Sequence, residues 1–213
     1  ELGYNMYAII TDGSISRYIN KPKAVTIGDV QYPANIFSIW TASQLAAIGI
    51  IAVTFDNSNK KNDEWYTNTN QTFTYDASAG TVTAAYGTAT AKAHADTTWS
   101  QQDSDDGNLP SDKSVGDVKA EGLKTKLIRK VKSEAESLLN QTDWYVTRKT
   151  EKNTAIPSAI TTWRDGIRTK QAEMETAITN ASDTPALETL YTYTTDSDGV
   201  TSRPLGDFPT LGS

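Results

Sequence analysis

Short apolar runs separated by turn residues occupy the first 99 residues of the chain. Residues 7–10 and 15–19 flank Asp12-Gly13, a dipeptide typical of hairpin turns, so they are predicted to form a β-hairpin. A second hairpin is predicted around the turn at residues 76–80. The strands are expected at residues 7–10, 15–19, 25–30, 35–40, 50–55, 72–75 and 81–86. These patterns predict a β-rich head domain over residues 1–99.

One short helix is expected within this head. Thr41 and Gln44 have the spacing of a capping box, in which a threonine caps the helix and the residue three positions later bonds back to it. The sequence therefore predicts a helix over residues 42–47 that ends near Gly49.

A polar linker at residues 100–114 precedes a predicted helical hairpin at residues 115–181. Its helices are expected at residues 115–141 and 157–181, and each carries a narrow apolar stripe. A lone hairpin buries little apolar surface, so this stripe favours self-association. The expected assembly seam consists of Ile128, Val131, Ala135, Leu138, Ile160, Trp163, Ile167 and Met174.

The segments outside these helices are predicted to be irregular. A turn and a polar linker join the two helices, and residues 182–213 are expected to form an extended C-terminal tail that lies on a neighbouring chain. The predicted fold class is α+β, with a small β-rich head followed by a two-helix hairpin and an extended C-terminal tail.

Composition removes several classes of function. The 213 residues include 31 threonines, have a net charge of −6 and contain no cysteine. The negative charge argues against nucleic-acid binding, which needs clustered basic side chains. Without cysteine there is no disulfide, zinc-thiolate site or thiol nucleophile. No apolar run approaches the length of a membrane helix, so no membrane insertion is expected, and the N-terminal stretch does not have a signal-peptide pattern.

The residues that carry chemistry elsewhere have ordinary explanations in this chain. His94 is the only histidine and has no nucleophile signature near it. Two aspartate-rich loops, around Asp103 and Asp196, depart from the calcium-loop pattern, so solvated turns are favoured. The lysines and arginines of the first long helix are flanked by glutamates, as on a solvated face. We therefore expect no enzymatic activity, no metal and no cofactor.

Two groups of side chains remain as candidates for interaction. Arg164 and Arg168 lie one helical turn apart and are expected to form structural salt bridges, with Asp143 or with a carboxylate of another chain. A set of aromatic residues in the head suits either stacking on host sugar rings or ordinary core packing; these residues are Trp65, Tyr66, Tyr75 and Tyr86.

The stretch from residue 138 to residue 168 carries a recognisable pattern. Leu138-Leu139 is followed by Thr142-Asp143-Trp144 and then by a helix with Arg164 and Arg168. This pattern resembles a module in tail proteins of tailed bacteriophages, of the tail-fibre and fibre-assembly type. The predicted strands of the head, the helix at residues 42–47 and the hairpin at residues 72–86 also resemble such proteins. The arrangement is similar to that of phages of marine, cyanobacterial-type hosts and covers most of residues 6–181.

The resemblance implies a structural virion protein of a phage tail, in or attached to a tail fibre and involved in host attachment. Its partners would be other copies of itself, a trimer in the context of a fibre, and other tail proteins. The expected location is the virion tail, after synthesis in the host cytoplasm. Three alternatives stay open: a fibre-assembly chaperone that is absent from the mature particle, a receptor module that binds a host glycan and, resting only on the abundant carboxylates, a glycan depolymerase.

Overall fold

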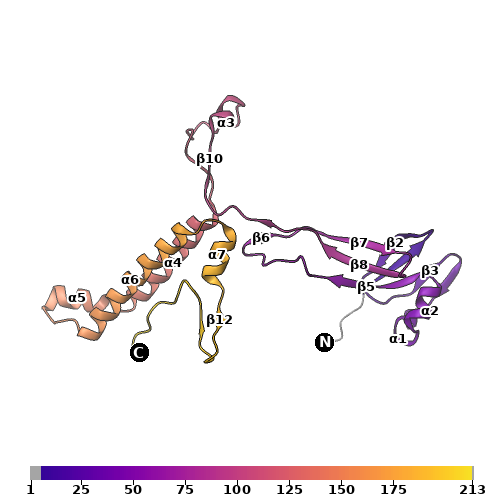
Figure 1. Ribbon diagram of the computed structural model, residues 1–213. Coiled ribbons are helices and arrows are strands. Elements are labelled where there is room, and N and C mark those ends of the chain that lie inside the picture. The colour runs from indigo at the N-terminus through magenta and orange to yellow at the C-terminus, as the bar shows by residue number, and fades with distance from the viewer. Residues whose placement is uncertain (1–5, 213) are drawn as a thin grey trace. The chain divides into compact units, whose positions relative to one another are not determined.

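The chain forms two compact units, unit 1 (residues 1–90) and unit 2 (residues 91–213), in a computed structural model that describes residues 6–212 (Figure 1). Strands and helices are both present, and the fold class is α+β as predicted. The boundary between the units precedes the predicted end of the head at residue 99. Residues 1–5, with which the predicted head and the stretch tested for a signal peptide begin, lie outside the described residues.

A five-stranded mixed sheet forms the body of unit 1. Its strands are β1 (Tyr7–Thr11), β2 (Ser14–Ile19), β5 (Ile50–Asp56), β7 (Gln71–Asp76) and β8 (Thr81–Tyr86). They are ordered β2-β1-β5-β8-β7, and all neighbours are antiparallel except β5 and β8, which are parallel. Both predicted hairpins, β1–β2 and β7–β8, are present.

Smaller elements complete unit 1. The helix predicted from the capping box is confirmed, because Thr41 and Gln44 make both reciprocal bonds at its start. The strand predicted at residues 35–40 is wrong: this segment is a helical turn in which the carbonyl of Asn35 accepts hydrogen bonds from two following amides. The smaller elements of unit 1 are β3 (Val25–Ile27), β4 (Val30–Tyr32), α1 (Ile36–Ile39), α2 (Ala42–Ala47) and β6 (Tyr66–Thr67). Strand β9 (Thr90–Ala91) spans the boundary between the units.

The sheet of unit 1 has a core on each face. Tyr7 and Ile9 on β1 point into a core that includes residues of α1 and α2, whereas Ala8 points into a core on the opposite face. The outermost strands β2 and β7 meet where the rings of Tyr18 and Phe73 lie 4.7 Å apart. The sheet is therefore curled around the core that contains Ala8.

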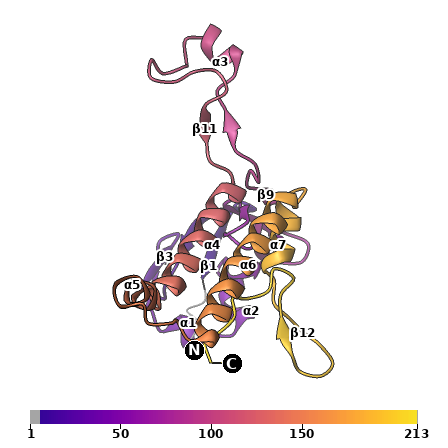
Figure 2. The same ribbon diagram turned by 90° about the vertical axis from the view of Figure 1, so that its left-hand side faces the viewer.

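Unit 2 begins with a protruding two-stranded arm, defined as residues 97–120 (Figures 1 and 2). It contains β10 (Thr97–Thr98), α3 (Gln101–Asp105) and β11 (Val118–Ala120). The predicted polar linker and the predicted helix start at residue 115 are therefore wrong. Gly116 has a φ of 96°, which a helix does not allow. Gly122 passes so close to the carbonyl of Ala95 that a Cβ there would collide with it.

Two long helices form the body of unit 2 and lie side by side in both ribbon views (Figures 1 and 2). They are α4 (Leu123–Asn140) and α6 (Ser158–Asn180), close to the predicted hairpin. Lys124 contacts the carbonyl of Thr179 near one end, and Arg164 contacts that of Leu139 near the other. These pairings show that the helices are antiparallel.

The connection between the two helices is itself helical. Its helix, α5 (Asp143–Lys152), replaces the turn and polar linker predicted there. It ends at Asn153, which has a φ of 52°, a left-handed conformation that asparagine tolerates at helix ends.

The C-terminal region is not a simple extended tail. It contains α7 (Thr184–Tyr191), β12 (Thr194–Thr195) and β13 (Thr201–Ser202). Asp183 caps α7 by accepting a hydrogen bond from the amide of Ala186. Leu187 and Leu205 are buried within the chain, so this region packs on its own unit. None of the helices in the described region is long and apolar enough to cross a membrane.

Candidate functional site

Arg164, in the second turn of α6, joins that helix to the end of α4 and the start of α5. Its Nη1 donates to the carbonyl of Leu139 at 2.8 Å and to the hydroxyl of Thr142 at 2.7 Å. Its Nη2 forms an ion pair with Asp143 at 2.8 Å. Thr142 donates its own proton to the carbonyl of Leu139. The predicted salt bridge between Arg164 and Asp143 is thus confirmed within one chain.

This network has a clear physical role. The last carbonyls of a helix have no partner inside the helix, and Arg164 supplies one to the end of α4. Asp143 lies in the first turn of α5, where a negative charge is favourable. Arg164 is almost fully buried whereas half of the Asp143 side chain is exposed, so the guanidinium depends on all three acceptors. The network fixes the angle between the helices and offers no reacting group.

Just beyond the network, α5 presents stacked aromatic side chains to solvent. Trp144 is 51% exposed, and its ring lies 3.7 Å from that of Tyr145, centroid to centroid. The guanidinium of Arg148 lies 4.8 Å from the Trp144 ring and 5.3 Å from the Tyr145 ring. Its Nε is buried and has no hydrogen-bond partner among the described residues. The motif therefore holds an aromatic and cationic surface in a fixed orientation.

The residues of the expected seam are occupied inside the chain. Ala135, Trp163 and Ile167 form one buried cluster of α4 and α6, and Val131, Ile160 and Met174 are buried as well. Ile128 and Leu138 are only half-buried. Leu127, next to Ile128, is more deeply buried than Ile128. Six of the eight side chains of the expected seam are thus already buried within a single chain.

The C-terminal segment covers one end of this helix pair. The indole nitrogen of Trp163 donates to the carbonyl of Pro209 at 2.8 Å, and Phe208 packs against the same cluster. The second motif arginine, Arg168, is exposed and pairs with Asp165 on its own helix at 3.1 Å. Arg164 and Arg168 therefore have different roles, although the sequence pattern predicted a structural salt bridge for both.

The aromatic residues proposed for sugar stacking are mostly unavailable. Trp65 and Tyr66 are buried, which leaves no open ring face for a ligand. Tyr75 packs against the core enclosed by the curled sheet. Tyr86 is half-buried beneath the ammonium group of Lys60. Core packing, the alternative reading of these side chains, describes Trp65, Tyr66 and Tyr75.

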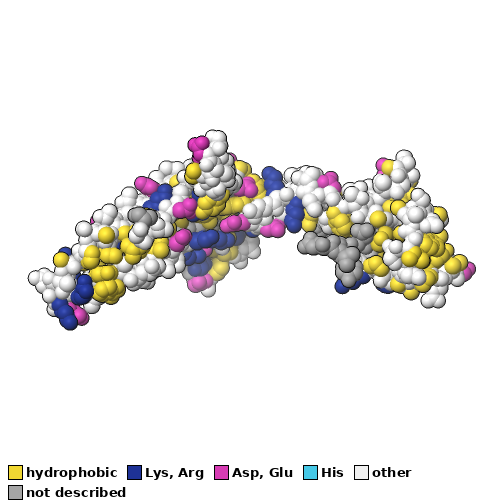
Figure 3. Space-filling view, turned by 90° about the horizontal axis from the view of Figure 1, so that it is seen from below, with side chains coloured by type: hydrophobic (Ala, Val, Ile, Leu, Met, Phe, Trp, Pro, Cys, Tyr) yellow, Lys and Arg dark blue, Asp and Glu magenta, His cyan; other side chains and the backbone are white. Residues whose placement is uncertain are grey.

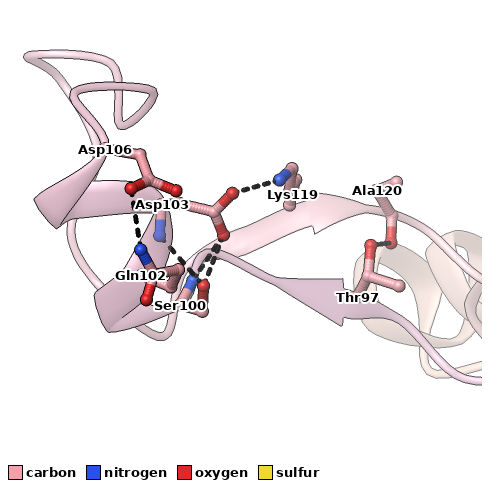
Figure 4. Close-up of polar contacts among 7 residues, drawn as sticks. All are labelled: Thr97, Ser100, Gln102, Asp103, Asp106, Lys119 and Ala120. Atoms are coloured by element: carbon pink, nitrogen blue, oxygen red, sulfur yellow. Dashed lines mark hydrogen bonds and ion pairs between the residues drawn. The ribbon is translucent and has the colours of Figure 1, made fainter.

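The aspartates considered for calcium are used in turns and ion pairs. Asp103 accepts from Ser100 in a capping box and pairs with Lys119 at 2.5 Å (Figure 4). The Lys119 ammonium group and then the Ser100 donors hold the pKa of Asp103 well below its usual range. Asp196 accepts hydrogen bonds from the amides of its own turn. No group of metal-ligating side chains is found within residues 6–212.

The described contact of His94 with α4 is made by its main chain. Its carbonyl accepts the amide of Lys124 at 2.9 Å, which ties the base of the arm to the first turn of α4. This accounts for the position of His94 without a chemical role for its imidazole.

The sequence did not reveal a pocket on unit 1. Its volume is about 430 Å³, and it is bordered by aromatic rings of β1 and α1 and by hydroxyl groups of α2 and β5. Hydrophobic side chains also gather on the surface of unit 1 seen in Figure 3. None of the residues that line the pocket is charged; they include Tyr7, Phe37, Trp40, Ser43 and Thr54. No sequence signal could have found it, because it depends on how α1 and α2 lie on the sheet.

Comparison of the chain with protein-family models, curated proteins and solved structures gave no match. Its assignment therefore depends on the sequence pattern and on the geometry described above.

Proposed function

We propose that this chain is a structural protein of the tail of a tailed bacteriophage, in or attached to a tail fibre, and that it acts by protein–protein assembly. The observation that carries the proposal is the convergence of the motif residues. Thr142, Asp143 and Arg164, which give the chain its resemblance to phage tail proteins, meet in one network. Such a network explains the motif as a device that sets the geometry of three helices.

The surroundings of the polar groups favour assembly over catalysis. Asp103, Asp143 and Asp196 are engaged in ion pairs and turns. A catalytic carboxylate pair would have to flank a cleft, and the pocket on unit 1 is lined by uncharged residues. The pocket beside Trp163 is bordered by Glu134 and Asp207, but Asp207 is already paired with Arg203 at 2.7 Å. The protruding arm and the exposed aromatic surface of α5 are both suited to contacts with other proteins.

The proposal includes a homo-oligomer, with other tail proteins as further partners. The interface differs from the one that the stripe pattern suggested, because α4 and α6 already cover the seam within one chain. The working surfaces would therefore be exposed elements of unit 2.

Quantitative mass spectrometry of purified phage particles tests this function. Peptides of this chain are expected in a fixed ratio to those of the major capsid protein, which serves as the internal reference. If the chain is abundant in infected-cell lysate but missing from particles, the tail-component proposal is overturned and the assembly-chaperone alternative is supported.

A further inference from the structure

We infer that the surface of α5 binds the arm of a second copy of this chain, so that copies assemble head to tail. Here the α5 surface means Trp144, Tyr145, Val146, Arg148 and Lys149. The inference deepens the proposed function, since it depends on the chain assembling with itself, and it names the two surfaces that meet.

The α5 surface has the composition of an interface centre. Tryptophan, tyrosine and arginine are the residues enriched where binding energy concentrates. Trp144 and Val146 are about half exposed, although both are hydrophobic. Among the described residues, Arg148 has no carboxylate partner, and its charge is held against two aromatic rings. Lysine and arginine side chains gather at the end of unit 2 that carries α5, at the far left of Figure 3.

The arm offers the complementary features. It carries five aspartates and only two lysines, in a segment where residues 110–121 are all exposed. Asp105 and Asp106 accept hydrogen bonds from neutral glutamine amides, which leave their charge uncompensated. Val115 and Val118 are about half exposed and give the arm apolar contact points. The positive α5 surface and the negative arm are therefore complementary in charge, and both carry exposed apolar side chains.

These surfaces cannot meet within one chain. The arm joins the first turn of α4, and α5 follows its last turn, so the two lie at opposite ends of the helix pair (Figures 1 and 2). An α-helix rises 1.5 Å per residue, so the 18 residues of α4 separate them by about 27 Å. A contact between them must therefore join two copies, and because it joins different surfaces, each copy can make two such contacts.

Complementary charge reversal tests the inference on the full chain. The α5 variant is Arg148→Glu with Lys149→Glu, and the arm variant is Asp105→Lys with Asp106→Lys. Each variant alone places like charges at every contact and is expected to weaken self-association at least about tenfold in sedimentation equilibrium. In an equimolar mixture, contacts between unlike copies again join opposite charges, so the average mass should rise above that of either variant alone.

Two controls keep the result interpretable. The variants Lys130→Glu on α4 and Asp198→Lys in the C-terminal region each reverse one charge elsewhere, half the change made by the paired variants, and should leave association unchanged. Far-UV circular dichroism of each variant checks folding, and Lys149→Glu alone provides a version that keeps Arg148 on its rings.

The outcomes separate this inference from the proposed function. If the wild type is monomeric, or if the mixture stays dissociated while both variants are folded, the contact between α5 and the arm is excluded. The presence of the chain in purified particles would stand or fall separately, by mass spectrometry. Recovery in the mixture alone supports the head-to-tail contact.

Discussion

Two arginines of the same type on α6 make very different contributions to the stability of unit 2. Arg164 and Arg168 are one turn apart on α6, yet only Arg164 is buried and bound to three acceptors. Charge-assisted hydrogen bonds of this kind are stronger than neutral ones. Exposed pairs such as Arg168 with Asp165 contribute little, because water competes for both charges.

Replacing Arg164 by alanine is expected to lower the free energy of unfolding of unit 2 by about 2–4 kcal/mol. The change leaves the carbonyl of Leu139 and the hydroxyl of Thr142 without this donor and opens a cavity. The matched variant Arg168→Ala should cost about 0.5 kcal/mol or less. Urea unfolding followed by circular dichroism at the helical band measures both. Equal losses would contradict the role assigned to the network.

The effect of replacing Gly122 by alanine on stability distinguishes two positions for this residue: inside a helix, as the sequence predicted, or at the N-cap of α4. Within a helix, replacing glycine by alanine stabilises by about 1 kcal/mol. At the observed N-cap of α4, the new Cβ would collide with the backbone of Ala95, so Gly122→Ala should destabilise unit 2. Gly166→Ala, inside α6, meets only the side chain of Pro209 and should be neutral or stabilising. Thermal melting of the two variants compares these effects, and a more stable Gly122→Ala would refute the arm geometry.

Whole elements differed in how well the sequence predicted them. The hairpins of unit 1 and α2 have local signals, such as Asp12-Gly13 and the Thr41 capping box, and were predicted correctly. The arm and α5 were missed because their conformation depends on partners distant in sequence. Asp96 holds the amide of Gly122, and Arg164 holds the start of α5. Polar segments of this kind look irregular until those contacts are known.

Only the part of the candidate site that depends on local signals could be predicted from the sequence. The pairing of Arg164 with Asp143 follows from charge and is confirmed, but the burial of Trp65 and Tyr66 depends on the tertiary fold. The apolar stripe was assigned to a partner chain because the sequence does not distinguish a helix of the same chain from one of another.

The tip of the arm is expected to lose order in acid. The pKa of Asp103 in the folded arm is lowered, chiefly by the Lys119 ammonium group, from an ordinary value of 3.8. Folding therefore favours the ionised carboxylate, and this contribution is complete above pH 3.8 and lost as the pH falls toward the folded pKa. The amides of Ser100 and Asp103 should lose protection between about pH 4 and about pH 2, measured by nuclear magnetic resonance.

The Asp103→Asn variant is the control for this experiment, because it has no carboxylate to titrate at that position. Its arm amides should show no pH-dependent loss of protection from this source. If the wild type and the variant respond identically, the bond between Asp103 and Lys119 does not stabilise the tip.

At the scale of the whole molecule, the division into two units predicts two independent stabilities. Each unit has its own buried core: Ala8 and Ile50 belong to clusters of unit 1, and Trp163 belongs to a cluster of unit 2. Arg164→Ala should therefore increase hydrogen exchange in α4, α5 and α6 while the sheet of unit 1 stays protected. Mass spectrometry of deuterated peptides gives both readings from one sample. Loss of protection in both units together would mean that they unfold as one.

The strand order of unit 1 also has a consequence for biosynthesis. Strand β5 is paired on one side with β1, and its other neighbour, β8, is made last of the five. Roughly 30 residues separate the end of β5 from the end of β8, so at ordinary translation rates the growing chain displays an open β5 edge for about 2–6 seconds. During that interval, neighbouring nascent chains on one messenger RNA could pair through Val53 and its strand. The arrival of β8 closes that edge and ends the interval.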